Sequence, residues 1–275
     1  TLLAVSSLMK FPAPYKNVLT VGLVLDAKGE KMSKSRGNTV EPFSLFETYG
    51  ADAVRWYFYT INQPWDEKLF LESDVQAASR QFLMILWNIV QYWEGTRQGV
   101  PGILRVSLPK LLINSWALAR LHDVEDKITK YLENYDVVSA ARLLGEFVTD
   151  DISRWYIRRI RDVMKIGNGT DKKETSAVLG SVLYSVAVLA APFVPFISDA
   201  IQQKIGIKRS IHEEAWPEPK KQETRNKKQK LRIKNQELLD NMKEVRGIVS
   251  LALEARAKAG IKVRQPIASL KIKNQ

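Results

Sequence analysis

The sequence predicts a mainly α-helical protein with one short strand–loop–helix unit near its start. Apolar residues recur at helical spacing in five long segments, which lie at 73–94, 114–132, 137–166, 174–191 and 235–258. Only 17–25 and 267–272 are strand candidates. Hydrophobic residues make up 45% of the 275 residues, so a sizeable core can be buried.

The first quarter of the chain contains the only α/β element. Residues 1–10 are expected to be helical, and Pro12 ends them. The strand candidate 17–25 ends at the turn 26–29, and two short helices, 42–50 and 51–61, follow the next loop. This order places the intervening loop at the edge or carboxyl end of a sheet, where α/β folds bind ligands.

The starts and ends of the later helices are marked by local signals. Ser73-Asp-Val-Gln76 has the form of a capping box, and Asn114 is a capping residue type, so we expect helices to begin there. Glycines and a proline within 95–102 predict a loop between these two helices. Pro192 and Pro195 bend or end the helix that begins at 174.

Net charge favours a polyanionic partner, and composition excludes some metal sites. The formal net charge is +12 and the pI is near 9.7. The absence of cysteine excludes disulfides and any thiolate zinc site. His122 and His212 are too far apart in the sequence to give metal-ligand spacing, so no metal site is expected.

Two apolar segments do not predict membrane insertion or export. Residues 177–197 carry no charge over 21 residues, but internal glycine, serine and proline favour a buried core helix over a membrane span. Residues 1–9 are apolar, yet they lack a basic lead and a start methionine, so we expect no signal peptide. They are better explained as the rear of a helix in progress, and we expect the chain to be a piece that begins inside a domain.

The loop that follows the first strand is the strongest functional candidate. Lys31-Met32-Ser33-Lys34-Ser35 places two lysines three residues apart, with serines between and beside them and glycines on both sides. A cationic loop rich in donors suits the phosphates of a nucleotide. On composition alone, a solvated lysine-rich loop would be the commoner explanation.

The predicted helix 137–166 carries a second candidate, for RNA. Arg154, Arg158, Arg161 and Lys165 recur at intervals of four, three and four, so they are expected to share a face, where an RNA backbone would relieve their repulsion. A solvated face with Asp151 and Asp162 as partners is the alternative. Arg159 is a further RNA candidate. The aromatic residues near these arginines are expected in the core rather than stacked on bases, and they are Trp116, Trp155 and Tyr156.

The segment 220–234 contains eight Lys or Arg and one Glu. Such a charge run predicts an exposed linker with electrostatic affinity for RNA. An amphipathic helix is expected after it, from about 235 to 258, and Gly260 ends that helix.

Several motifs resemble the class I aminoacyl-tRNA synthetases. Lys31–Ser35 is identical to their signature loop, and the flanks 22–26, 37–38 and 49–55 also agree. Residues 190–196 resemble the Ala-Pro-Phe-x-Pro-Phe segment in the helical anticodon-binding domains of the Ile/Val/Leu/Met subgroup. The isoleucyl members fit best, through segments that include 55–57, 64–65, 86–88, 153–159, 210–217 and 263–266.

The resemblance implies a fold and a division into domains. We expect the end of a Rossmann-like α/β catalytic domain over 1–72 and a helical-bundle anticodon-binding domain over 73–219. A basic linker with a C-terminal helix and strand would occupy 220–275. The family's His-x-Gly-His element, amino-acid pocket and editing domain do not occur in the sequence, so the chain alone is expected to be inactive.

The same resemblance implies an isoleucine–tRNA ligase that joins isoleucine to ATP and transfers it to tRNA-Ile. Lys34 would contact the ATP phosphates and stabilise the departing pyrophosphate, and Lys31 would support it. Met32, Ser33 and Ser35 would complete the ATP contact. Magnesium would arrive with ATP, and no zinc is expected. Such an enzyme would be a cytoplasmic monomer without a membrane partner.

The sequence leaves three alternatives. The first is a valyl or leucyl enzyme, since the amino-acid pocket that would distinguish them is missing. The second is a stand-alone tRNA-binding helical module in which the loop has no catalytic role. A basic helical scaffold without a nucleic-acid role would leave the motifs unexplained.

Overall fold

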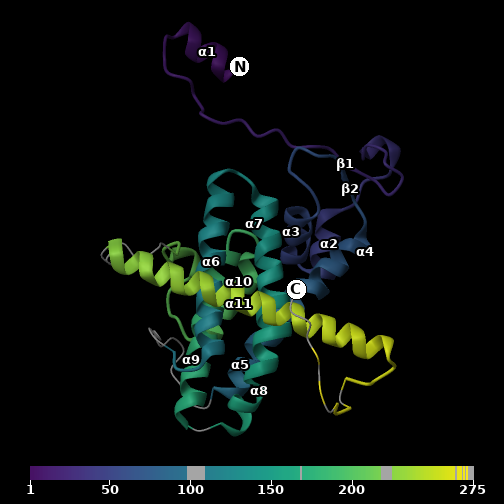
Figure 1. Cartoon of the computed structure of the whole chain (residues 1–275). Coiled ribbons are helices and arrows are strands. Elements are labelled where there is room, and N and C mark those ends of the chain that lie inside the picture. Colours follow the sequence, from purple (N-terminus) through teal and green to yellow (C-terminus); the bar gives the residue numbers. More distant parts are fainter. Residues whose placement is uncertain are drawn as a thin grey trace.

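The computed structural model describes residues 1–97, 109–167, 169–217, 225–263, 265–267, 269 and 271, and over 225–232 it describes the backbone alone. Helices dominate, which confirms the predicted class (Figure 1). The α-helices are α1 Leu2–Leu8, α2 Pro42–Tyr49, α3 Ala51–Thr60, α4 Glu72–Ala78, α5 Met84–Thr96, α6 Leu112–Glu133, α7 Val137–Glu146, α8 Ile157–Ile166, α9 Gly169–Ala190, α10 Pro195–Ile205 and α11 Arg225–Lys258. The remaining elements are the strands β1 Val24–Leu25 and β2 Lys68–Leu69, the 3₁₀ turns η1 Lys34–Arg36 and η4 Ile211–Glu213, and the π-helical segments η2 Ser79–Leu83 and η3 Phe147–Tyr156.

The α/β unit is small. β1 pairs in parallel with β2, and α2 and α3 connect them. Its own core contains Leu45, Val54, Tyr57, Phe70 and Val75. The predicted strand 17–25 is shorter than expected, because in the described chain only β2 offers backbone partners. Gly22 is needed here, since a Cβ at this position would lie 2.1 Å from the carbonyl oxygen of Asp66.

The larger core lies in the helical bundle formed by α5–α10. Its biggest fully buried side chains include Trp93, Trp116, Tyr156, Phe82 and Phe147. Burial of a large aromatic or aliphatic side chain contributes about 1.5–3 kcal/mol, so these residues dominate the stability of the bundle. The long helix α11 lies across the bundle and contacts α6 (Figure 1). Leu238, Met242 and Val249 pack from α11 against the core.

Two helices begin within two residues of the predicted positions, but their predicted N-caps are wrong. Leu71 is the N-cap of α4, and Ser73 lies inside that helix, where its hydroxyl contacts the carboxylate of Asp74. Leu111 is the N-cap of α6, and Asn114 is fully buried within it. Asn114 donates to Glu174 and Thr175 and accepts from the Tyr156 hydroxyl, so tertiary hydrogen bonds replace the local cap.

The predicted helix 137–166 is continuous but not α-helical throughout. Ten residues, Phe147–Tyr156, form the π-helical segment η3 between α7 and α8. The backbone hydrogen bonds of a π-helix join residues five apart instead of four. Successive side chains in η3 are therefore rotated by a smaller angle than in an α-helix. Arg158, Arg161 and Lys165 lie in α8, where the spacing argument for one shared basic face holds, and Arg154 lies in η3, just before that helix.

The C-terminal region differs from the expected linker. The last helix begins at Arg225, not near 235, so most of the basic run is helical. Residues 218–224 and most of the predicted loop at 95–102 lie outside the described residues. In the predicted strand 267–272, residues 267, 269 and 271 are not in a strand, and the others also lie outside the described residues.

The N-terminal helix α1 stands at the end of an extended segment, away from the rest of the chain (Figure 1). None of its residues is buried. No helix in the described part of the chain is both long enough and apolar enough to cross a bilayer.

Candidate nucleotide loop and nucleic-acid interface

Asp26 organises the turn that leads from β1 into the lysine loop. Its Oδ1 accepts the backbone N–H groups of Lys28 and Glu30, both at 2.9 Å. Its own N–H donates to the carbonyl of Glu30 at 2.9 Å. Gly29 has φ +80°, a conformation that favours glycine. The turn therefore reverses the chain within a few residues and starts the loop next to the sheet.

Asn38 closes the other end of the loop. Its side-chain amide donates to Asp26 Oδ2 at 2.9 Å and to the Lys31 carbonyl at 3.3 Å. Its Oδ1 accepts the N–H of Ser33 at 2.9 Å. These bonds, first among them that from Asn38, lower the pKa of the Asp26 carboxyl. The side chains of Asp26 and Asn38 thus fix the backbone of the loop, while the side chains of Lys31 and Lys34 take no part in these bonds.

The side chains at the tip match the chemistry of phosphate binding. Lys31 and Lys34 are both exposed, and neither forms an ion pair with the residues that the structure describes. The hydroxyls of Ser33 and Ser35 lie 3.2 Å apart. Lys34 begins η1, which ends at Gly37 with φ +66°. The arrangement offers two cations and two hydroxyls on one short, exposed segment.

Met32 points the other way, toward the small core. It packs against the cluster that contains Leu45 and Phe70. It also lines a hollow of about 450 Å³ together with Val24, Val40, Pro42, Phe46, Val54, Arg55, Phe58 and Tyr59. The apolar packing of Met32 anchors the loop, whereas the lysines on either side face solvent.

The basic residues of α8 are exposed as the sequence predicts. Arg158, Arg159, Arg161 and Lys165 are all exposed. Arg154 is exposed too, but it lies in η3 and pairs with Asp150 at 2.6 Å. It also lines a separate hollow with residues of α3 and α4. Arg154 therefore already has a carboxylate partner within its own segment.

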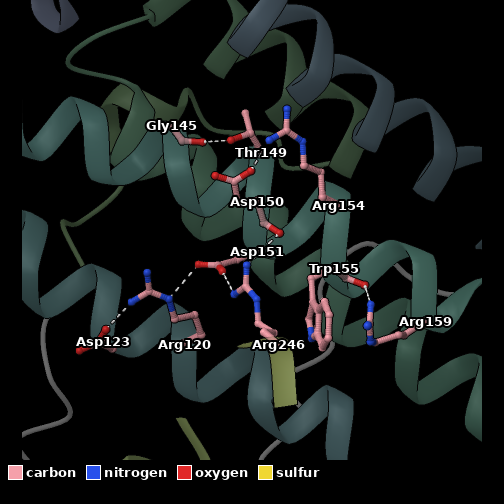
Figure 2. A network of polar contacts seen from close by, with 10 residues as sticks. All are labelled: Arg120, Asp123, Gly145, Thr149, Asp150, Asp151, Arg154, Trp155, Arg159 and Arg246. Atoms are coloured by element: carbon pink, nitrogen blue, oxygen red, sulfur yellow. Dashed lines mark hydrogen bonds and ion pairs between the residues drawn. The ribbon is translucent and has the colours of Figure 1, made fainter. Parts of the chain in front are cut away.

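Asp151 has a role that the sequence did not indicate (Figure 2). It is 4% exposed and does not pair with the α8 cations as proposed. It accepts from Arg120 Nε of α6 at 2.8 Å and pairs with Arg246 of α11. Arg120 also pairs with Asp123 at 2.5 Å. A single buried carboxylate therefore ties α11 and α6 to η3.

Two aromatic rings border this ion-pair network. The guanidinium of Arg246 lies 5.9 Å from the ring centre of Trp116 and 5.4 Å from that of Trp155. Arg159 covers the ring of Trp155 and donates to its carbonyl at 3.1 Å (Figure 2). Burial and the charge of Arg246 lower the pKa of Arg159. Trp116, Trp155 and Tyr156 are all buried, which confirms the expectation that they belong to the core.

In the described ranges, no group of three or more His, Asp or Glu side chains could hold a metal ion. The loop offers the groups that a polyanion site needs. Cations and hydroxyls at its tip fit the phosphates of a nucleotide, whose own oxygens are the usual ligands of magnesium.

The segments that contain the loop and the bundle each match a known protein family. Residues 114–272 match the family described as the anticodon-binding domain of tRNA ligase, and residues 1–69 match the class I tRNA synthetases (I, L, M and V). The chain is 35% identical over 266 residues to the isoleucine–tRNA ligase of Thermus thermophilus, covering 93% of the chain and 24% of the relative. It is 34% identical over 278 residues to that of Deinococcus radiodurans, covering 98% of the chain and 24% of the relative.

The chain thus spans about a quarter of the length of the curated relatives it matches. Its fold is similar to that of LeuRS from Agrobacterium radiobacter K84, solved as a ternary complex with tRNA and LeuAMS. The TM-score is 0.64 at 22% identity, over 78% of this chain and 26% of that one.

Proposed function

Because the chain belongs to the anticodon-binding-domain family of the tRNA ligases, and its first 69 residues match the class I synthetases, we propose that it is part of an isoleucine–tRNA ligase. The observation that carries this proposal is the exposed Lys31–Ser35 loop beside a family-matched helical bundle. The relatives that match nearly the whole chain are isoleucine–tRNA ligases, which favours isoleucine over valine or leucine.

In the complete enzyme, the reaction joins the carboxylate of isoleucine to the α-phosphate of ATP and releases pyrophosphate. The isoleucyl group then moves to the 3′ end of tRNA-Ile. Lys34 stabilises the negative charge on the departing pyrophosphate, and Lys31 shares the phosphate contact. The hydroxyls of Ser33 and Ser35 donate hydrogen bonds to phosphate oxygens or brace the loop. Magnesium enters with ATP, held mainly by the phosphates.

The bundle is the part that binds tRNA in this proposal. Arg158, Arg159, Arg161 and Lys165 of α8 contact the RNA backbone, since they are exposed cations on one helix. Arg154 is a weaker candidate because it already pairs with Asp150. The domain divisions after residues 72 and 219 remain predictions, and the packing of α11 on α6 joins the third segment closely to the second.

The experiment is Lys34→Ala in the complete ligase. Removing a charge that acts on the transition state should lower the rate of ATP–pyrophosphate exchange by about 10²–10³-fold, with the fold intact. Lys28→Ala, in the adjoining turn, is the matched control and should leave the rate near that of the wild type. An unchanged rate in Lys34→Ala would contradict the assignment. The 275-residue chain alone should show no exchange, because the amino-acid pocket is absent from its sequence.

A further inference from the structure

The start of α3 contacts the turn between α9 and α10, which lies about 140 residues later in the sequence. Asp52 of α3 is 7% exposed, and its carboxylate accepts the N–H groups of Phe196 at 3.4 Å and Ile197 at 2.7 Å. These are the second and third residues of α10, which begins at Pro195. The first N–H groups of a helix have no partner within it, and they favour a negative charge. Asp52 therefore caps a helix of the bundle from outside the bundle.

Arg55, one turn further along α3, binds the opposite kind of group in the same segment. Its Nε donates to the carbonyl of Phe193 at 2.8 Å, and an Nη donates to that of Pro192 at 2.7 Å. Hydrogen bonds from a guanidinium are charge-assisted and directional. Asp52 and Arg55, which we call the clamp, therefore bind both the donors and the acceptors of the turn between α9 and α10.

A side chain of the bundle also binds α3. Arg142 of α7 donates to the carbonyls of Thr60 and Ile61, at 2.8 Å and 2.7 Å, and so caps the end of α3. Between the clamp at the start of α3 and Arg142 at its end, Trp56 of α3 stacks on Phe82 with the ring centres 3.6 Å apart. Both ends of α3 are thus fixed to the bundle, and its middle is buried against it.

The helix α3 is also tied to the lysine loop. The Tyr57 hydroxyl donates to the Leu69 carbonyl of β2 at 2.7 Å, and Leu69 pairs with Leu25 of β1. Leu25 in turn forms an isolated antiparallel bridge with Lys31. A short series of hydrogen-bonded elements therefore runs from the turn between α9 and α10, through α3 and the strands, to the loop.

We propose that Asp52 and Arg55 are positioning residues that fix the tRNA-binding bundle relative to the ATP loop. This inference rests on the proposed function. Neither residue contacts ATP or RNA in this account. Adenylation needs only the loop and the rest of the catalytic domain, whereas transfer needs the tRNA end to reach that site while its anticodon is bound. Loosening the clamp therefore impairs transfer and spares adenylation.

The first arm of the test measures orientation and does not depend on the function. The chain has no cysteine, so spin labels can be placed at exposed Lys28→Cys and Lys208→Cys, one on each side of the clamp. Pulsed electron resonance should give one narrow distance distribution for the parent chain. It should give a distribution at least twice as wide for Asp52→Asn/Arg55→Met. Equal widths would overturn the inference, whatever the enzyme does.

The second arm uses the complete ligase and separates the two steps. In Arg55→Met, ATP–pyrophosphate exchange should stay within 2-fold of wild type and the KM for tRNA within 3-fold, while the kcat of aminoacylation falls by at least 10-fold. Arg55→Lys, which keeps the positive charge but has a single donor nitrogen, should recover part of the loss. Arg80→Met, at an exposed arginine of η2, is the matched control and should change nothing.

The outcomes distinguish failure of the inference from failure of the proposed function. If exchange and aminoacylation fall together, or if neither changes, the clamp has no positioning role. If the wild-type ligase charges no tRNA at all while the distance distribution still widens, the clamp is real and the proposed function is wrong. Thermal unfolding of each variant excludes global unfolding as the cause, and Arg55→Lys keeps the test usable if Arg55→Met does not fold.

Discussion

Different interactions stabilise the lysine loop and the helical bundle. Hydrogen bonds among residues 26–38 fix the base of the loop, so its contacts are local in sequence. The bundle depends on buried side chains and on pairs such as Asp151 and Arg246, which are 95 residues apart. Changes in the loop should therefore alter chemistry with little effect on stability, and changes in the bundle core should do the reverse.

The largest expected effect on stability comes from Asp151→Asn. The substitution keeps the shape but removes the charge that compensates Arg120 and Arg246. Breaking a buried ion pair costs about 3 kcal/mol, so the free energy of unfolding should fall by about that amount. Urea unfolding at pH 7 measures it.

Asp150→Asn is the matched control for that experiment, one residue away. Its pair with Arg154 leaves the two side chains 44% and 65% exposed, and exposed pairs contribute at most about 1 kcal/mol. Equal losses from the two variants would contradict the structural role of Asp151.

A buried carboxyl in α6 gives the second prediction. Burial raises the pKa of Glu125 to about 7, despite its hydrogen bond with Ser185. Because the folded pKa exceeds the unfolded one, this group's contribution to stability is full below about pH 4.5 and is lost as the pH rises through 7. Relative to Glu125→Gln, the wild type should therefore lose about 3 kcal/mol between pH 4.5 and pH 8.

Urea unfolding at several pH values checks this prediction. Glu133→Gln changes an exposed glutamate of the same helix and should give a curve parallel to that of the wild type. A pH-independent difference between Glu125→Gln and the wild type would show that the carboxyl titrates at its ordinary pKa.

The exposed face of α8 should matter for RNA and not for folding. Arg158→Ala/Arg161→Ala/Lys165→Ala should weaken tRNA binding about 10-fold at low salt. Each lost phosphate contact reduces the salt slope by about 0.7–0.9, so the triple variant should lose about 2 from the slope. Lys208→Ala/Arg209→Ala removes exposed charge elsewhere and serves as control. An unchanged slope would remove α8 from the interface.

The smallest effect is expected at Asn38. Asn38→Ala removes three hydrogen bonds at the base of the loop, so the amide of Ser33 should exchange faster and the pKa of Asp26 should rise toward its ordinary value. Global stability should change by no more than about 0.5 kcal/mol, because the site is partly exposed. Amide exchange and NMR titration measure both effects, with Thr39→Ala as control. A large loss of global stability would contradict the distinction between loop and bundle.

The sequence predicts the lysine loop more completely than the helical bundle. The loop was found from residues 31–35 because its signal is a short, contiguous string of specific residue types. Helices were found from their apolar spacing. Asn114 was misassigned because its partners come from α9 and η3, and no local signal distinguishes a cap from a buried polar bridge.

The network around Asp151 and the clamp also escaped prediction. No spacing in the sequence links Arg120 or Arg246 to Asp151, because the three residues lie in different helical elements. Asp52 and Arg55 were noticed only as part of a family motif, and their contacts depend on how α3 packs against the turn after α9. The π-helical segment η3 likewise has no spacing signal in the sequence.

The proposed function requires the bundle to recognise tRNA-Ile. The direct measurement is binding of the chain to tRNA-Ile and tRNA-Val, native and unmodified, at two salt concentrations. We expect tighter binding to tRNA-Ile that persists at the higher salt, because contacts to unstacked anticodon bases do not depend on counterion release. Equal binding to both tRNAs, lost together as salt rises, would mean that only charge attracts RNA and would contradict the claim.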